Sequence, residues 1–441
     1  MSKNKQLDLA RWACEQAVKS GAREARASVN RTRYVSLEYR ERIVEKLEEA
    51  TTNGLSLDIY SQGRYSSHRT SDLRKDALAK FVSESVAMTG YLTEDPNRRL
   101  PEPKYYEGRK DMDLELLDGK YGGVEAEHRH KVAKEVEAAA LDAGGDRIIS
   151  VTAGYYDSLS ERATVASNGF EGQTEETSFW SGAEVTAKDE GEKRPTDWWW
   201  QGGSTRSFVS DPGAIGRKAT ARALGRVGSS KIPTENMTII IENRATGRLL
   251  RYLGAGMRGR NLQQKSSFLE GKQGEQVFSP LLTITDDPFV KRGQGSRLFD
   301  GEGMAARQMP VIEKGVLKNY FIDTYYGRKL GMEPTTGSPS NSVFSLGDKG
   351  EDGWIKEVGR GVVVTGFIGG NSNSSTGDFS AGVQGFLFED GAIVKPVSEL
   401  NIAGNHLEFW KKLVGVGNNP YAYSSLRAPC LVFEGVTVAG A

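Results

Sequence analysis

MTIIIENRATGRLLRYLGAGMRGR, residues 237–260, joins an apolar run to a stretch with helical periodicity. The run at 237–242 is typical of a buried strand. Apolar residues at the spacing of one helix face follow it: Leu249, Leu250, Leu253 and Met257. The segment therefore predicts a strand followed by a helix, and it starts the second half of the chain.

Within this segment, Gly254-Ala-Gly256-Met-Arg-Gly259 has the spacing of a dinucleotide-binding loop. In a dinucleotide-binding fold the first glycine ends the strand, so that the helix N-terminus faces the pyrophosphate. Here residues 243–253 separate the strand from the first glycine, and the glycines fall inside or at the end of the predicted helix. A helix C-terminus disfavours phosphate, so dinucleotide binding is not predicted.

Residues 244–260 contain five arginines and no carboxylate, histidine or cysteine. Arg244, Arg248 and Arg251 lie on one helical face. This face is either solvated or packed against carboxylates, because guanidinium groups form bidentate pairs. The acidic pairs Asp286-Asp287 and Asp300-Gly-Glu302 are the predicted partners.

Composition restricts the class of protein. A chain of 441 residues predicts two domains. Lys+Arg and Asp+Glu both total 58, and a general nucleic-acid binder would carry a basic excess. The two cysteines, Cys14 and Cys430, lie far apart, and no apolar run approaches the length of a signal peptide core or membrane span. We expect a cytoplasmic protein that binds neither nucleic acid nor membrane.

The first half of the chain contains one pattern twice. A helix near 6–20 precedes strands at 25–30, 34–39, 55–60 and 65–70, with turns at 52–54 and 61–63, and then a helix over 72–89. A helix near 126–143 precedes strands at 147–153, 163–167 and 176–187, with a turn at Asn168-Gly169, and then a helix over 211–224. The repetition favours an internal duplication.

Residues 226–236 are predicted to separate two domains, 1–232 and 233–441. Beyond them, short strand-like runs alternate with glycine-rich turns: 277–286, 311–323, 361–368, 383–388 and 430–438. The predicted fold class is α+β, with helices packed on an antiparallel sheet in the N-terminal domain. The C-terminal domain is predicted to be mostly β and barrel-like.

Few residues are suited to catalysis. The four histidines (His68, His128, His130, His406) form no HExxH or HExxxH motif, so a zinc site within this chain is not predicted. The acidic pairs could hold a hard cation, but salt bridges are the favoured interpretation. The polar loop at 371–380, with Asn371 and Asp378, has hydroxyls without an evident base and is predicted to shape a groove. Because strand side chains alternate, Trp198, Trp199 and Trp200 cannot all face one core, which favours a cleft or a partner surface.

The order and spacing of several stretches resemble the TldD/TldE (PmbA) family of peptidase and maturation proteins. These are LTITDDP at 282–288, FDGEG at 299–303, VIEKGVLKNY at 311–320, GDFS at 377–380, FEDG at 388–391, KPV at 395–397 and FEGVTVAG at 433–440. GRYSS from Gly63, EDP from Glu94 and Leu100-Pro101 extend the resemblance to essentially the whole chain.

The resemblance implies a role for the opening segment. In the family's catalytic TldD branch, a helix after this strand carries HExxxH, two zinc-binding histidines and a glutamate, and here that motif would fall at about 251–256. That branch also takes a cysteine ligand from a glycine-rich loop that corresponds to 418–427, which contains no cysteine, and Cys430 in the following strand is not expected to replace it. The chain therefore resembles the TldE (PmbA) branch, which implies a non-catalytic subunit without a cofactor of its own.

The implied partner is a TldD-like zinc subunit, with which the chain would process unfolded or modified peptides as a heterodimer. Six residues are predicted to contact peptide or partner: Arg248, Arg251, Trp198, Trp199, Asn371 and Asp378. Two alternatives stay open. One is a metal-independent hydrolase that uses the 371–380 loop, and the other is a homodimeric peptide-binding scaffold.

Overall fold

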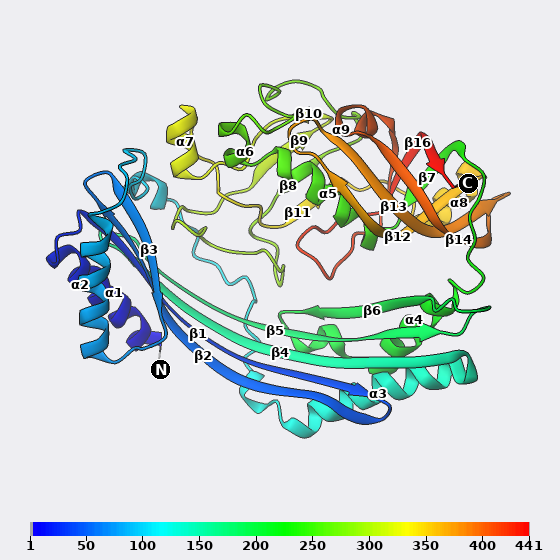
Figure 1. Cartoon of the computed structure of the whole chain (residues 1–441), viewed down its shortest axis with the longest axis horizontal. Coiled ribbons are helices and arrows are strands. Elements are labelled where there is room, and N and C mark those ends of the chain that lie inside the picture. The colour runs from blue at the N-terminus through cyan, green and yellow to red at the C-terminus, as the bar shows by residue number, and fades with distance from the viewer. Residues whose placement is uncertain (1–2, 441) are drawn as a thin grey trace.

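A computed structural model describes residues 3–440 of the chain. The N-terminal half forms one antiparallel sheet of six strands in the order β3-β2-β1-β4-β5-β6. Its strands are β1 (Glu24–Arg40), β2 (Ile43–Ser61), β3 (Arg64–Thr70), β4 (Ile148–Ala166), β5 (Glu171–Ala187) and β6 (Thr196–Gly203). The sheet bends around the C-terminal half, which lies over its concave side (Figure 1).

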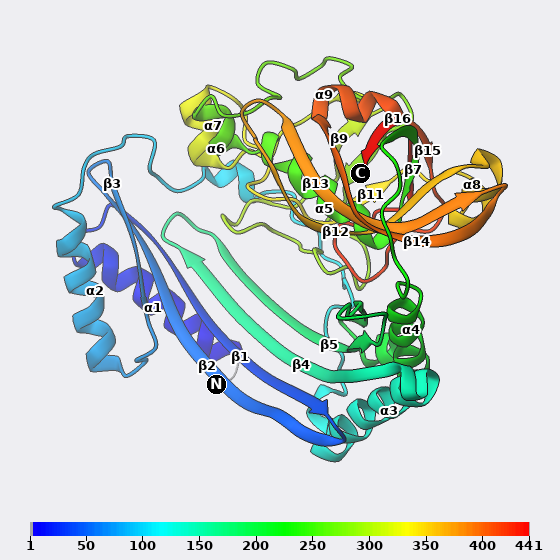
Figure 2. The ribbon, with the colours of Figure 1, turned by 45° about the vertical axis from the view of Figure 1, so that its right-hand side comes forward.

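The sheet has a repeated topology. Helix α1 (Lys3–Lys19), strands β1 to β3 and helix α2 (Lys75–Thr89) form one unit, and α3 (Ala126–Gly144), β4 to β6 and α4 (Pro212–Leu224) form the other. The units meet where β1 pairs with β4 at the centre of the sheet. Figure 2 shows α1 and α2 at one end of the outer face and α3 and α4 at the other. The predicted repetition of helix, meander and helix is confirmed.

The strands are longer than their sequence patterns indicated. Residues 25–30 and 34–39 belong to the single strand β1, and 147–153 and 163–167 are parts of β4. The predicted turn at 52–54 is wrong, because Thr52, Asn53 and Gly54 continue β2 opposite Thr32, Arg31 and Asn30 of β1. A continuous neighbouring strand supplies hydrogen-bond partners even where side chains do not alternate.

Two local signals position the helices and turns as predicted. Gln62 and Gly63 both have positive φ (50° and 73°) in the β2–β3 turn, which matches the backbone of a tight hairpin. The Asp211 carboxylate accepts a hydrogen bond from the Ala214 amide at 2.8 Å and caps α4. The helix predicted over 72–89 begins later than expected, because Arg74 occupies the cap position and α2 starts at Lys75.

A free edge remains on β2. Strand β3 pairs with β2 only over residues 55–61. Residues 43–54 of β2 pair with β1 on one side, and no strand of the described chain pairs with their other side. Ile43, Val44 and Leu47 are 66%, 41% and 59% exposed there. Exposed apolar side chains beside unpaired backbone groups are unusual in a sheet, since such an edge can pair with another chain.

The C-terminal half contains a barrel. Strands β14-β13-β12-β7-β16 are hydrogen-bonded in that order, and β14 also pairs with β16, which closes the ring. Strands β7 and β12 are parallel, and β15 extends the sheet beyond β16. The bounds are β7 (Glu235–Ile241), β12 (Gly361–Ser372), β13 (Asp378–Glu389), β14 (Ala392–Asn405), β15 (Leu413–Val416) and β16 (Leu431–Ala439).

Two predicted strand runs are mostly irregular. Residues 277–286 and 311–323 contribute only short strands to a second, four-stranded sheet: β8 (Ile284–Asp286), β9 (Met309–Glu313), β10 (Val316–Leu317) and β11 (Ser342–Phe344). Their apolar residues Val277, Phe278 and Leu282 instead fill the barrel core from loops. Strand β14 was not predicted, because much of its outer surface is polar or exposed.

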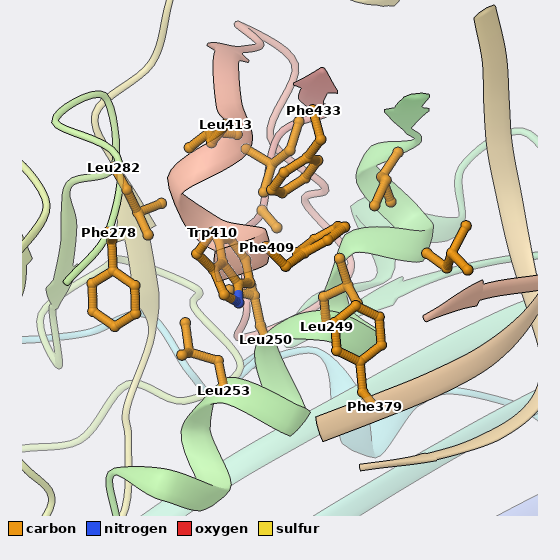
Figure 3. Close-up of a cluster of buried hydrophobic side chains, with 14 of the residues drawn as sticks. Leu249, Leu250, Leu253, Phe278, Leu282, Phe379, Phe409, Trp410, Leu413 and Phe433 are labelled. Atoms are coloured by element: carbon orange, nitrogen blue, oxygen red, sulfur yellow. The ribbon is translucent and has the colours of Figure 1, made fainter. Parts of the chain in front are cut away.

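Helix α5 (Asn243–Gly256) is the predicted helix of the opening segment, and Gly254 and Gly256 lie in its last turn as expected. Its leucines Leu249, Leu250 and Leu253 belong to one buried cluster with side chains of the barrel strands and of the helical segment after β14 (Figure 3). The strands contribute Phe379 and Phe433, and the helical segment contributes Phe409 and Trp410. Each buried leucine contributes about 2 kcal/mol of transfer free energy. The opposite face of α5 carries the arginines, so barrel packing fixes where these side chains lie.

The two halves are connected by residues 225–234, between α4 and β7. The Arg328 guanidinium of α7 (Thr324–Leu330) also donates hydrogen bonds to carbonyls of Asn97, Arg99 and Leu100 in the long connection before α3. The division into domains at 1–232 and 233–441 stays a prediction. Within residues 3–440, no helix combines the length and apolar character needed to cross a bilayer.

Candidate functional site

A cavity of about 420 Å³ lies between β6 of the first half and α5 of the second. The loop that precedes β16 forms its third wall. Its lining is aromatic and cationic: Trp180, Trp198, Trp200, Asn243, Arg244, Gly247, Arg251, Tyr421, Tyr423, Ser424, Leu426 and Ala428. The cavity brings together Trp198 and Arg251, which the sequence singled out from distant segments.

Four charged residues fix the junction beside this cavity. The Arg244 guanidinium lies 3.0 Å from the Asp197 carboxylate, with side chains only 6% and 4% exposed. The Arg222 guanidinium donates to both Glu242 oxygens at 2.7 and 2.9 Å and lies 3.5 Å from Asp197. Asp197 and Arg222 belong to the N-terminal half and Glu242 and Arg244 to the C-terminal half, so the network joins the two.

The predicted carboxylate partners of the arginines are wrong. Asp286 accepts from the Ser340 amide, and Asp300 accepts from the amides of Glu302 and Met304. Glu302 accepts from Thr324. These acidic residues bind groups within the C-terminal half of the chain. The partner of Arg244 is instead Asp197 on β6.

The three arginines of α5 have different surroundings. Arg244 is held by Asp197, and its guanidinium lies 4.2 Å from the centre of the Trp198 ring. Arg248 donates to the Tyr252 hydroxyl at 2.8 Å and to the Gly369 carbonyl at 3.1 Å. Arg251 lines the cavity with an exposed side chain. Within residues 3–440 its guanidinium makes no hydrogen bond or ion pair.

The tryptophans divide between two environments, as strand alternation requires. Trp198 and Trp200 line the cavity, and Trp198 is 37% exposed. Trp199 packs on the core between α3, α4 and the sheet, and its ring meets those of Tyr421 and Tyr423 edge-on. Burial raises the pKa of Tyr421 to about 12, so its hydroxyl stays protonated at neutral pH. Trp199 does not line the cavity but packs against Tyr421 and Tyr423, which do.

The two segments that the resemblance connects with zinc are in contact. The Asn243 side-chain amide of α5 donates to the Asn419 carbonyl at 2.7 Å, and the Thr246 hydroxyl donates to the Pro429 carbonyl at 3.2 Å. A Cβ on Gly247 would lie 3.3 Å from a Leu426 methyl group. The first turns of the helix therefore pack closely on the loop, and Arg251, at the start of the expected motif, lines the same cavity as Gly247 and Leu426.

The residues at this place do not fit a zinc ion. Zinc binds thiolate, neutral imidazole and carboxylate ligands, and the cavity lining contains none of them. Glu242 and Asp197 nearby are paired with arginines. Burial, with Glu351 nearby, raises the pKa of the Cys430 thiol to about 12, which disfavours the thiolate. Over residues 3–440, no group of three or more potential ligand side chains occurs.

Asn371 and Asp378 lie away from the cavity, at the far end of the β12–β13 hairpin. Asn371 is paired with Ser380 in the ladder. The Asp378 carboxylate accepts hydrogen bonds from the Thr376 hydroxyl at 2.6 Å and the Asn405 amide at 2.9 Å, and these bonds lower its pKa. Both residues shape the loop at 373–377 and are not brought together with Arg251 and Trp198.

Beside this loop, the end of β12 and the residue after β14 form a hydroxyl–imidazole pair that the sequence did not reveal. The Ser372 hydroxyl lies 3.0 Å from Nε2 of His406, which is 34 residues away in sequence. The His406 ring is fully buried and stacked between Phe268 and Phe379. Burial lowers the His406 pKa to about 4, and its Nδ1 has no partner within the described chain. The pair therefore lacks the third group that orients the base in a hydrolytic triad.

The fold and site define a class: a two-part α+β protein whose barrel presents an arginine-bearing helix to a curved sheet. The models of the PmbA/TldA metallopeptidase central and C-terminal domains match residues 120–227 and 234–440. The chain belongs to the PmbA/TldD family.

Known relatives agree with this assignment. A crystal structure of a proposed modulator of DNA gyrase from Bacteroides thetaiotaomicron superimposes with a TM-score of 0.96 at 39% identity and covers 100% of both chains. Metalloprotease PmbA of Escherichia coli O157:H7 is 28% identical over 94% of this chain and 92% of its own length. A metalloprotease TldD homolog of Haemophilus influenzae is 29% identical over 45% of this chain and 44% of its own.

Proposed function

We propose that this chain is the non-catalytic, TldE/PmbA-type subunit of a zinc peptidase whose metal is held by a TldD-like partner. The observation that carries this proposal is the composition of α5 and its neighbouring loop. In the segments 251–256 and 418–427, where the resemblance places the zinc ligands of the catalytic branch, this chain presents Arg251 and Tyr421 to the cavity. Similarity to PmbA over nearly the full length, but to a TldD homolog over less than half, supports the same assignment.

In this proposal the chain helps to hold an unfolded or modified peptide. The network of Asp197, Arg222, Glu242 and Arg244 keeps the sheet and the barrel in one relative position. The cavity between them is lined by rigid aromatic rings, which bind side chains at low entropic cost. The chain thus contributes a preformed wall for the peptide and leaves bond cleavage to its partner.

The free edge of β2 is the surface proposed for the partner subunit. Residues 43–54 offer unpaired backbone groups together with the exposed Ile43, Val44 and Leu47. A strand of the partner would extend the sheet and remove these apolar side chains from water. Glu45, Glu48 and Glu49 against the single Lys46 give this strand a negative balance, which favours a basic strand opposite.

A metal-independent hydrolase is the second candidate, because Ser372 and His406 form a hydroxyl–imidazole pair. Several features weigh against it. The imidazole is fully buried, its pKa is lowered to about 4, and Nδ1 lacks a partner among residues 3–440. A base with this pKa accepts a proton weakly at neutral pH. A homodimeric peptide-binding scaffold is the third candidate and would use the β2 edge with a second copy.

The test is to purify the chain alone and together with a TldD-type subunit from the same cell. Bound zinc is measured by elemental analysis, and cleavage is measured on an unfolded peptide with and without chelator. The proposal expects a zinc-free, inert chain and a pair whose cleavage is lost in chelator. Chelator-resistant cleavage by the chain alone would favour the hydrolase, and stable homodimers that bind peptide without cleaving it, even with the TldD-type subunit present, would favour the scaffold.

A further inference from the structure

We propose that the cavity between β6 and α5 binds a carboxylate carried by a peptide, with Arg251 as its ionic contact and the aromatic walls holding the adjacent side chain. The choice of a peptide as carrier rests on the proposed function. The recognition of a carboxylate follows from the charges, contacts and lining of the cavity itself.

The first step concerns charge. The cavity lining contains two arginines, Arg244 and Arg251, and no aspartate or glutamate. Arg244 is already neutralised by Asp197 at 3.0 Å. Glu242 accepts two hydrogen bonds from Arg222 at 2.7 and 2.9 Å. Glu351, which interacts with Glu242, Asp352, Arg222 and Lys218, does not line the cavity. No carboxylate of the junction is therefore available to Arg251, and an incoming anion would be its partner.

The second step concerns the kind of anion. A guanidinium forms two parallel hydrogen bonds with a carboxylate, which matches its planar shape. Among the described residues that line the cavity, Arg251 is the one cation without a carboxylate partner, and it balances one negative charge. A phosphate group would bring about two at neutral pH. A carboxylate fits this charge balance better than a phosphate.

The third step concerns what accompanies the carboxylate. Rings of Trp180, Trp198, Trp200, Tyr421 and Tyr423 line the cavity together with Leu426. One face of Trp198 is covered by Arg244, and Tyr421 and Tyr423 meet edge-on at 5.6 Å, so these rings are held in place. A volume of about 420 Å³ lies within the range of small-molecule sites. The cavity therefore suits an apolar or aromatic side chain beside the anionic group.

The carboxylate could come from the C-terminus of a peptide or from an aspartate or glutamate side chain. Both sources present the same group to Arg251, and the probes below distinguish them. The probes are three N-acetylated hexapeptides that end in phenylalanine. The first has a free C-terminal carboxylate, and the second is the same peptide with a C-terminal amide. The third is the amide peptide with glutamate in place of the residue before the phenylalanine. Binding to the full-length chain alone is followed by calorimetry and by tryptophan fluorescence.

The expected result is that at least one carboxylate peptide binds the native chain and that the neutral amide binds about tenfold or more weakly, as loss of a charge-assisted contact implies. Arg251→Gln should lower the affinity for the carboxylate peptide by a similar factor. Arg251→Lys should keep part of that affinity. Arg260→Gln, an exposed arginine on α6 (Gly259–Gln263) outside the cavity lining, should leave binding unchanged. Binding of the free acid alone identifies the C-terminus, and binding of the glutamate amide identifies a side chain.

Equal affinity for the neutral amide would overturn the proposal, as would an unchanged affinity in Arg251→Gln or no binding of any probe by the native chain. The assay needs neither zinc nor a partner subunit. A failure to bind would therefore leave the subunit role standing, and an inactive pair would leave the carboxylate site standing.

Discussion

Arg244 on α5 and Asp197 on β6 form an ion pair of 3.0 Å across the junction between the two halves of the chain. Both side chains are nearly buried, at 6% and 4% exposure. The same Asp197 also lies 3.5 Å from Arg222, so one carboxylate serves two guanidinium groups. The position of the cavity depends on this contact, because its two main walls meet there.

Replacing this carboxylate is expected to destabilise the junction. Asp197→Asn keeps the volume of the side chain but removes the negative charge that compensates the buried positive charge of Arg244. Removal of one member of a buried ion pair costs about 3 kcal/mol or more. Chemical denaturation followed by tryptophan fluorescence measures the loss, since Trp198 lies under Arg244 at 4.2 Å.

Glu235→Gln is the matched control for that experiment. Glu235 is paired with Arg360, but the two side chains are 41% and 48% exposed. Exposed pairs contribute about 1 kcal/mol or less. Equal losses in both variants would contradict a special role for the junction network.

The sequence was sufficient for much of the fold but not for the surroundings of α5. Strand and helix periodicity predicted α5 and the burial of Leu249 and Leu253, because local spacing determines which helix face is apolar. Periodicity carries no information on which distant strand meets the polar face. The pairing of Arg244 with Asp197, 47 residues earlier, and the approach of Tyr421 depend on tertiary packing.

Other parts of the site were beyond sequence pattern for different reasons. The adjacent tryptophans indicated a cleft or a partner surface, and alternation along β6 directs Trp198 and Trp200 to one side and Trp199 to the other. Ser372 and His406 are brought together only because β12, β13 and β14 pair side by side. Loop tyrosines such as Tyr423 have no periodic signal, since a loop has no repeating geometry.

Acid is expected to reduce stability through His406. Burial lowers its pKa in the folded chain to about 4, whereas an unfolded histidine titrates near about 6.5. Between these values the unfolded chain binds more protons, so this contribution is complete above about pH 6.5 and is lost as the pH falls toward 4. The full effect is about 3 kcal/mol as an upper value.

The measurement is the free energy of unfolding between pH 7 and pH 4 in the native chain and in His406→Phe. Phenylalanine keeps the stack between Phe268 and Phe379 without a titrating group. The variant should therefore show a shallower pH dependence over this window. His68→Gln, at a half-buried strand position, is the control and should keep the native slope. An unchanged slope in His406→Phe would show that another group causes the acid sensitivity.

Ser372→Ala is expected to leave peptide cleavage by the reconstituted pair within about twofold of the native rate. In the proposed function Ser372, the last residue of β12, holds the start of the 373–377 loop through His406 and takes no part in bond cleavage. Removing a hydroxyl nucleophile from a hydrolase would instead lower the rate by orders of magnitude. Steady-state cleavage of the same unfolded peptide distinguishes these outcomes, and a thermal melt verifies that the variant is folded.

Charges on the free edge of β2 are expected to prevent assembly with the partner while the chain itself stays folded. Val44→Glu combined with Leu47→Glu places two carboxylates where the native side chains are 41% and 59% exposed. The free energy of unfolding should therefore change by about 0.5 kcal/mol or less for each substitution. Burying those carboxylates under a partner strand would be unfavourable. Co-purification and sedimentation with the TldD-type subunit should therefore show separate chains.

Leu281→Glu, at a position 50% exposed on the other half of the chain, is the control and should assemble normally. Normal assembly of the β2 variant would place the partner on another surface, whereas loss of assembly in both variants would point to a general effect of added charge.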